Sequence, residues 1–309
     1  MSEVAEATTI IGELETSMGM PVVVFMANWK GEYAVDPGEE GGRRLASTLA
    51  QVHRRQGEPE EMALVMLGRG GTGAFCDQVL RCAANLGIRL DVVVPHRIDG
   101  APAMVALGAD RITLHPQGGI GAVDAGVLVA GRQRIDASLQ QISGVDPLDL
   151  VSLSEADKAF ISRLAYERQV QGEMRQIAHR WLSGETPWAM QQTLGRAGAL
   201  GADELREEGV NIRVTPAPLA EQLEELLTWA ESFMHLFRMP SERFEVSAEV
   251  ADEVEFEPAT LIPAAVLLEA SGGWLFELDT GSPDPFAPRL LGQWSNWEPE
   301  AVDGETQGE

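Results

Sequence analysis

Residues 62–124 carry most of the information about the fold of this protein: MALVMLGRGGTGAFCDQVLRCAANLGIRLDVVVPHRIDGAPAMVALGADRITLHPQGGIGAVD. The apolar run at 62–67 predicts a buried strand, and the glycine-rich turn after it leads into a helix with apolar residues at helical spacing. A second buried strand is predicted at 90–94, a helix at 101–109 and a short strand at 111–114. This order of strands and helices is typical of a layered α/β protein.

Composition limits the classes of partner. A chain of 309 residues is long enough for a large α/β domain and a smaller module. The formal net charge of -25 argues against nucleic acid and anionic membranes as partners, because both require cationic contacts. Solvated acidic faces explain such a charge, and a basic partner is the other explanation.

The cysteines and the apolar runs predict a cytoplasmic location. Cys76 and Cys82 lie on different faces of one predicted helix, so we expect free thiols in a reducing compartment. The first residues are acidic and lack the pattern of a secretion signal. No apolar run approaches the roughly 20 residues of a membrane-spanning helix, so we expect no membrane association.

Outside this segment, periodicity predicts four further main-domain elements. The β-prone run at 21–29 is expected to form the first core strand, and the apolar stripe at 42–56 predicts a helix. A capping-box pattern at Ser154 begins a helix predicted to reach about residue 182. A last helix is predicted at 215–237.

The composition changes after Met239, where apolar and acidic residues alternate as in strands. We expect two strands in LIPAAVLLEA and GGWLFELD, followed by a proline-rich tail. The chain is therefore divided into an N-terminal arm at 1–18, which is a short helix or a loose segment, a main domain at 19–238, and an acidic β module or oligomerisation arm at 239–309. Three tryptophans of this last segment either contact a partner or pack the module's own core: Trp274, Trp294 and Trp297.

Three landmarks at fixed spacing carry a resemblance: the turn at 68–71, the segment at 100–110 and the segment at 120–124. Together they resemble the Clp-protease and crotonase-like superfamily, most closely its serine dehydrogenase proteinases near the signal-peptide peptidases. The resemblance extends more weakly over residues 19–237. It implies an α/β core of repeated strand-strand-helix units, with the acidic β module appended, and a homo-oligomer.

The resemblance places the nucleophilic serine at Gly100, which has no side chain. Acyl transfer by a serine protease needs an oxygen nucleophile with a base in reach, and glycine supplies neither. We therefore expect a pseudo-protease that keeps a peptide- or acyl-binding groove and acts as a scaffold or regulatory subunit for a protein or peptide partner. The alternative is an active cytosolic peptidase of the serine-lysine type, or one inactivated by engineering at this position.

The same resemblance implies an oxyanion hole. The amide of Gly70 or Gly71, together with that of Ala101, would donate to an acyl oxygen. Such a hole binds a carbonyl even without the nucleophile. Nothing in the sequence marks a coenzyme A pocket, and we predict no cofactor.

Two side chains are weak candidates for the catalytic base. Lys158 is the only lysine after Gly100, and serine-lysine relatives use a downstream lysine. His115 is similar to a Clp-protease histidine in its neighbours, although the resemblance places it on the surface. The histidines and cysteines show no metal-ligand spacing, so no metal site is predicted.

A third function remains open at the glycine turn. Gly68, Gly70 and Gly73 fit the G-x-G-x-x-G pattern, in which backbone amides bind a dinucleotide pyrophosphate. That site needs an acid at the end of the next strand to hold the ribose. Asp91 is near in sequence, but it is predicted at the start of that strand.

Overall fold

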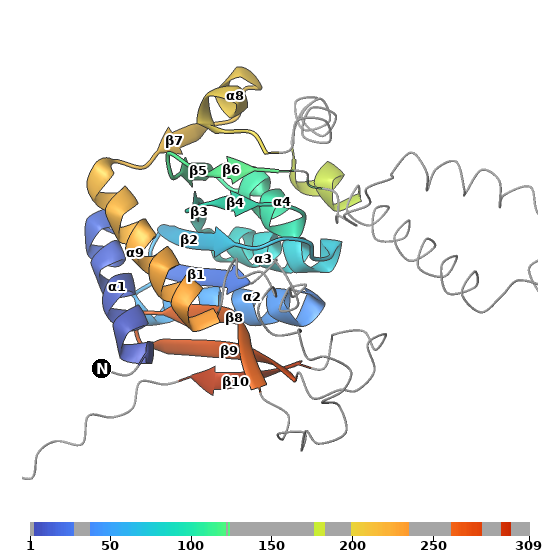
Figure 1. The fold of residues 1–309 in the computed structure, drawn as a ribbon. Coiled ribbons are helices and arrows are strands. Elements are labelled where there is room, and N and C mark those ends of the chain that lie inside the picture. The colour runs from blue at the N-terminus through green and yellow to red at the C-terminus, as the bar shows by residue number, and fades with distance from the viewer. Residues whose placement is uncertain are drawn as a thin grey trace, which may run out of the picture.

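The computed structural model describes residues 3–27, 38–121, 123, 176–182, 199–234, 261–279 and 292–297. Its centre is an eight-stranded mixed sheet in the order β10-β9-β8-β1-β2-β3-β5-β7 (Figure 1). The mixed α/β class predicted from the sequence is confirmed. No helix among the described residues has the length and apolar character needed to cross a bilayer.

Five of the eight strands are parallel and adjacent, in chain order: β1 (Val22–Ala27), β2 (Glu61–Leu67), β3 (Arg89–Val94), β5 (Arg111–Leu114) and β7 (Ile212–Val214). All six residues of β1 and the last six of β2 are buried. Strands covered on both faces have continuous apolar sequences, which explains why these runs do not alternate with polar residues.

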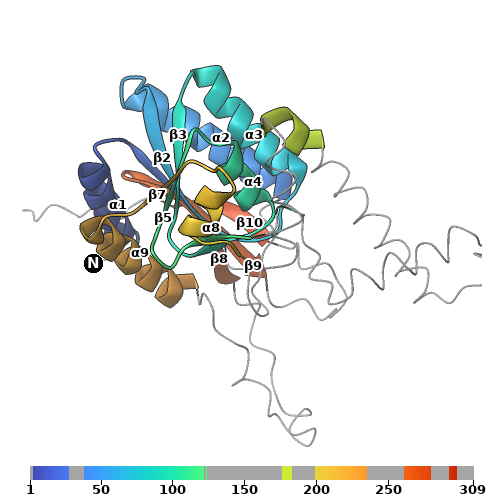
Figure 2. The same cartoon turned by 90° about the horizontal axis from the view of Figure 1, so that it is seen from above.

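Helices cover both faces of the sheet (Figures 1 and 2). On one face α1 (Glu3–Met18) packs beside α9 (Ala217–Met234). On the other lie α2 (Gly38–Arg55), α3 (Gly73–Leu86) and α4 (Ala101–Gly108). The short α8 (Ala202–Glu207) precedes β7. The result is a three-layer arrangement with an apolar core on each side of the sheet.

A second, two-stranded sheet contains β4 (Arg97–Ile98) and β6 (Gly119–Ile120), which pair in parallel. A β-bridge joins Gly68, directly after β2, to Ile98 of β4. The chain order β3, β4 and α4 is strand-strand-helix, whereas only the single bridged residue Gly68 lies between β2 and the turn that leads to α3.

The segment assigned to an N-terminal arm contains a helix. Residues 3–18 form α1, whose Ile11 and Leu14 are fully buried against the sheet and α9. The apolar positions of α1 are separated by three and four residues, which places them on one helical face. This helix is part of the main core.

The described part of segment 239–309 continues the main sheet. Its strands β8 (Leu261–Glu269), β9 (Gly272–Asp279) and β10 (Gly292–Trp297) are antiparallel, and β8 pairs with β1. The strands predicted in LIPAAVLLEA and GGWLFELD are confirmed, whereas β10 lies in the predicted tail. Apolar strands with a free edge gain most by pairing with an existing sheet, and β1 provides that edge.

Two of the three tryptophans pack against the main domain. The guanidinium of Arg44 on α2 lies 4.4 Å from the ring centroid of Trp274 and 6.0 Å from that of Trp294. Both rings are partly buried against the core. The side chain of Trp297 lies outside the described residues, as does most of the helix predicted at 154–182, of which 176–181 is described as helical.

Removing a core contact of β8 tests whether the C-terminal strands belong to one cooperative unit. Leu267 is fully buried in the same core as Phe25. Leu267→Ala should lower the free energy of unfolding by about 2–5 kcal/mol, because it leaves a cavity in a shared core. Urea unfolding followed by tryptophan fluorescence and by circular dichroism should show one transition by both probes.

The matched control is Glu231→Ala on the exposed face of α9, which should change stability by less than about 0.5 kcal/mol. Two separated transitions in the unmodified protein, with Leu267→Ala affecting only one of them, would show that the C-terminal strands fold as an independent module.

Candidate functional site around Gly100

The site is formed where the glycine turn after β2 meets the start of α4. Because β2 and β3 are neighbours, the segments that follow them lie side by side. The amide of Asp99 donates to the carbonyl of Gly68 at 3.2 Å, and the amide of Ala101 donates to the carbonyl of Gly70 at 2.6 Å. These two hydrogen bonds connect the turn to the N-terminus of α4.

Gly100 is the N-cap residue of α4, with φ 67° and ψ -131°. This positive φ disfavours residues with a side chain. A Cβ at position 100 would lie 2.4 Å from the carbonyl oxygen of Gly70 and 2.9 Å from its carbonyl carbon. The place that the resemblance assigns to the nucleophile is therefore filled by backbone, and no side chain fits there without a rearrangement of Gly70.

The predicted oxyanion residues lie together, but one of their donors is in use. Gly70 and Gly71 both have positive φ, 75° and 91°. The Ala101 amide, expected to donate to an acyl oxygen, instead donates to Gly70. An acyl oxygen can accept from Ala101 only after the Gly70 carbonyl has turned away.

An ion-pair cluster flanks Gly100. Asp99 is 6% exposed and accepts two hydrogen bonds of 2.9 Å from the guanidinium of Arg97, while Nε of Arg69 lies 3.5 Å from its Oδ2. A Cβ at Gly121 would lie 1.5 Å from Asp99 Oδ1, so the Asp99 carboxylate packs directly on the Gly121 backbone. Fork-like Arg–carboxylate pairing fixes orientation, and Asp99 thereby holds the end of β4 against β6.

The sequence analysis did not predict this ion-pair cluster. Arg97 and Asp99 are two residues apart, which places both side chains on one face of a strand, and this spacing was the available signal.

The thiol of Cys76 contacts the site. Its Sγ donates to the carbonyl of Ala101 at 3.2 Å. Burial raises the pKa of the Cys76 thiol far above its usual value, because the thiolate would be desolvated. Since the thiolate is the reactive form, Cys76 is a packing residue.

His115 does not join Gly100 in one site, and the expected surface position was wrong. The side chain is 4% exposed, at the end of β5, where Nδ1 accepts from the Gln117 amide at 3.2 Å. Its Nε2 lies 3.3 Å from a carboxylate oxygen of Glu224 on α9. His115 therefore faces α9, whereas Gly100 begins α4 on the other side of the sheet.

Two predictions concern Lys158 and metals. Lys158 lies outside the described residues. Over the described ranges, no three His, Cys, Asp or Glu side chains come together in a way that could hold a metal ion.

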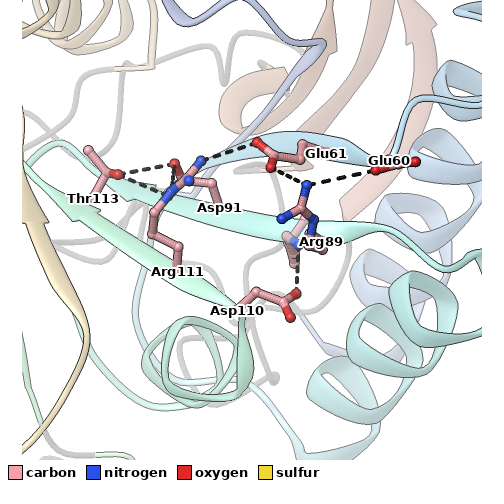
Figure 3. Close-up of polar contacts among 8 residues, drawn as sticks. Glu60, Glu61, Arg89, Asp91, Asp110, Arg111 and Thr113 are labelled. Atoms are coloured by element: carbon pink, nitrogen blue, oxygen red, sulfur yellow. Dashed lines mark hydrogen bonds and ion pairs between the residues drawn. The ribbon is translucent and has the colours of Figure 1, made fainter.

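A second polar group lies at the opposite, amino-terminal edge of the strands (Figure 3). Asp91 on β3 is 2% exposed and accepts from Nε of Arg111 at 2.7 Å and from the hydroxyl of Thr113 at 2.9 Å. Arg111 also lies 3.7 Å from Glu61, which pairs with Arg89 at 2.5 Å. These side chains alternate in charge across β2, β3 and β5.

This group borders an open pocket of about 240 Å³ lined by Glu61, Arg89, Leu90, Asp91, Asp110, Arg111 and Asn211. Partial burial lowers the pKa of Arg111, but Asp91 and Glu61 outweigh it and hold the Arg111 pKa above its usual value. Each guanidinium is already paired with carboxylates, so the network joins the amino ends of three strands. In the sequence, this network is indicated by charged residues two positions apart on neighbouring strands.

The dinucleotide site predicted at Gly68, Gly70 and Gly73 lacks two required features. Asp91, the candidate ribose ligand, is engaged with Arg111 at the amino end of β3, while the glycine turn follows the carboxyl end of β2. The parallel strands also follow one another in chain order, without the reversal that opens a nucleotide crevice.

Neither a scan against protein-family models nor a search of curated protein sequences finds a match to this chain. The proposed function therefore rests on the geometry around Gly100 and on the resemblance to the serine dehydrogenase proteinases.

Adding a single methyl group tests the closure at Gly100. Gly100→Ala should lower the free energy of unfolding by about 2–4 kcal/mol, because the positive φ and the Gly70 contact both oppose a Cβ. The control is Gly57→Ala, which has φ 79° with nothing within 4 Å of the added Cβ and should cost only about 1 kcal/mol. Equal losses in urea unfolding would show that position 100 has room for a side chain.

The amino-edge network makes a separate prediction. Asp91→Asn should lower the free energy of unfolding by about 2–4 kcal/mol, because Arg111 would lose its buried counter-ion. Asp110→Asn is the matched control: Asp110 is exposed and its carboxylate accepts from the Leu90 amide. Thermal unfolding should separate the two variants, and equal melting temperatures would contradict a structural role for Asp91.

Proposed function

We propose that this protein is a catalytically impaired homologue of the serine dehydrogenase proteinases, a pseudo-protease that acts as a scaffold or regulatory subunit. The observation that carries the proposal is the closure at Gly100. The position that resembles the nucleophile lacks a side chain, and the carbonyl of Gly70 lies where a Cβ would be. Hydrolysis through an acyl-enzyme has no attacking atom there.

The arrangement of the chain supports the family part of the proposal. The resemblance implies a core of repeated strand-strand-helix units; β3–β4–α4 follows that order, and β2 and α3 have a single bridged residue, Gly68, in place of a second strand. In the separate small sheet β4 pairs with β6, and an isolated bridge joins Ile98 of β4 to Gly68. Gly100 lies between the second strand and the helix of its unit, where the resemblance expects the nucleophile.

The hydroxyls nearest in sequence to Gly100 are used elsewhere. Between Thr72 and Thr113 the chain contains no serine or threonine. Thr72 caps α3 by accepting from the Phe75 amide, and Thr113 donates to Asp91 at the other edge of the strands. Neither is available as a substitute nucleophile in this conformation.

The remaining parts of the proposal concern partners. By resemblance the chain forms a homo-oligomer in the cytoplasm and binds a protein or peptide along the groove beside the glycine turn. The acidic composition favours a basic surface on that partner. The groove amides of Gly70, Gly71 and Ala101 are the backbone groups that would meet an acyl oxygen.

Activity-based labelling tests the proposal. The purified chain, incubated with a fluorophosphonate probe, should show no labelled serine, and unfolded protein substrates should remain intact, because the position that resembles the nucleophile carries no hydroxyl. An active serine peptidase, treated alongside, serves as the positive control.

Labelling that disappears when one serine is changed to alanine would overturn the proposal. A loss of hydrolysis in Lys158→Ala would then identify the serine-lysine alternative. Labelling and hydrolysis gained by Gly100→Ser would instead support an active site from which only the serine had been removed.

A further inference from the structure

The peptide between Gly70 and Gly71 is hydrogen-bonded to the Ala101 amide, the donor that the proposed groove would offer to an acyl oxygen. Its carbonyl accepts the Ala101 amide at 2.6 Å, a short hydrogen bond for an N–H donor. Ala101 is the first residue of α4, and its amide has no acceptor within the helix. In this closed arrangement the Gly70 carbonyl accepts the hydrogen bond that the Ala101 amide would otherwise donate to a ligand.

The two residues that flank this peptide have unequal roles. Turning the peptide plane over changes ψ of Gly70 and φ of Gly71, and leaves φ of Gly70 unchanged. The φ of Gly71 would move from 91° by about 180° to about -90°, which residues with side chains adopt freely. The φ of Gly70 would remain at 75° in both orientations.

We propose that the Gly70–Gly71 peptide is a switch: closed, its carbonyl blocks the Ala101 amide, and turned over, it presents the Gly71 amide beside that of Ala101. The turned state exchanges one acceptor for a second donor, which creates a pair of N–H groups that an acyl oxygen can accept from. The inference rests on the proposed function for the identity of that acceptor. The switch itself rests on the backbone contact.

The absence of a side chain at position 100 is a requirement of the same switch. A Cβ there would lie 2.4 Å from the Gly70 oxygen, so the closed state and a side chain at position 100 exclude each other. Gly100 therefore permits the closed state of the Gly70–Gly71 peptide. The same glycine leaves the nucleophile position without a side chain and allows the Gly70 carbonyl to block the Ala101 amide.

The two neighbouring glycines provide a matched pair of variants. In Gly71→Ala the closed state places alanine at an unfavourable positive φ and the turned state relieves it, so the equilibrium should move to the turned state. In Gly70→Ala the unfavourable φ is present in both states. This variant should be destabilised without a change in the balance between them.

Hydrogen exchange resolved to single amides in the full chain measures the balance. In Gly71→Ala the Ala101 amide should exchange at least about tenfold faster than in the unmodified protein, whereas the Met104 amide, which donates to Gly100 in the same helix, should be unchanged. In Gly70→Ala the ratio of the two rates should stay within about threefold of the unmodified value. An unchanged ratio in Gly71→Ala, or an equal change in both variants, would overturn the switch.

The unmodified protein gives a second measurement that does not depend on how the variants fold. If the peptide turns over within the folded state, Ala101 exchanges faster than Met104 and with a weaker dependence on urea. If the contact is a static cap, both amides exchange at one rate with one urea dependence, and the proposal fails. A fluorophosphonate-labelled serine would overturn the proposed function while leaving these exchange results unaffected.

Discussion

The parallel pairing of β2 with β3 determines the geometry on which the rest of the site depends. Both strands are buried by helices, so their register is fixed by the core. That register places the glycine turn after β2 against the segment after β3, where Gly68 bridges Ile98 and Gly70 accepts from Ala101. Each strand gives alternate side chains to two apolar cores, so a slip of one residue would exchange side chains between those cores. The backbone contact at Gly100 therefore depends on the packing of both cores.

Much of this core could be predicted because its signals are local. The continuous apolar runs of β1, β2 and β3 and the apolar stripe of α2 are readable without tertiary information. Thr72 before α3 and Gly87 after it are recognisable helix boundaries. The absence of a side chain at Gly100 was also visible in the sequence, although its backbone neighbour was not.

The errors concern relations between distant segments. Strand propensity identified β8 and β9, but it does not say which edge a strand joins, and β8 joins β1. The burial of His115 depends on α9, which begins about a hundred residues later and brings Glu224 to its ring. The Asp91–Arg111 and Asp99–Arg97 pairs were missed because charged residues at strand ends are equally typical of solvent-exposed positions.

The pairing of β8 with β1 also affects how the chain folds as it is synthesised. More than two hundred positions separate these adjacent strands, so the hydrogen-bonding edge of β1 remains without its neighbour until Leu261 and the residues after it have left the ribosome. At typical rates of synthesis this interval is about 10–50 s. During that time an apolar strand edge is open to aggregation.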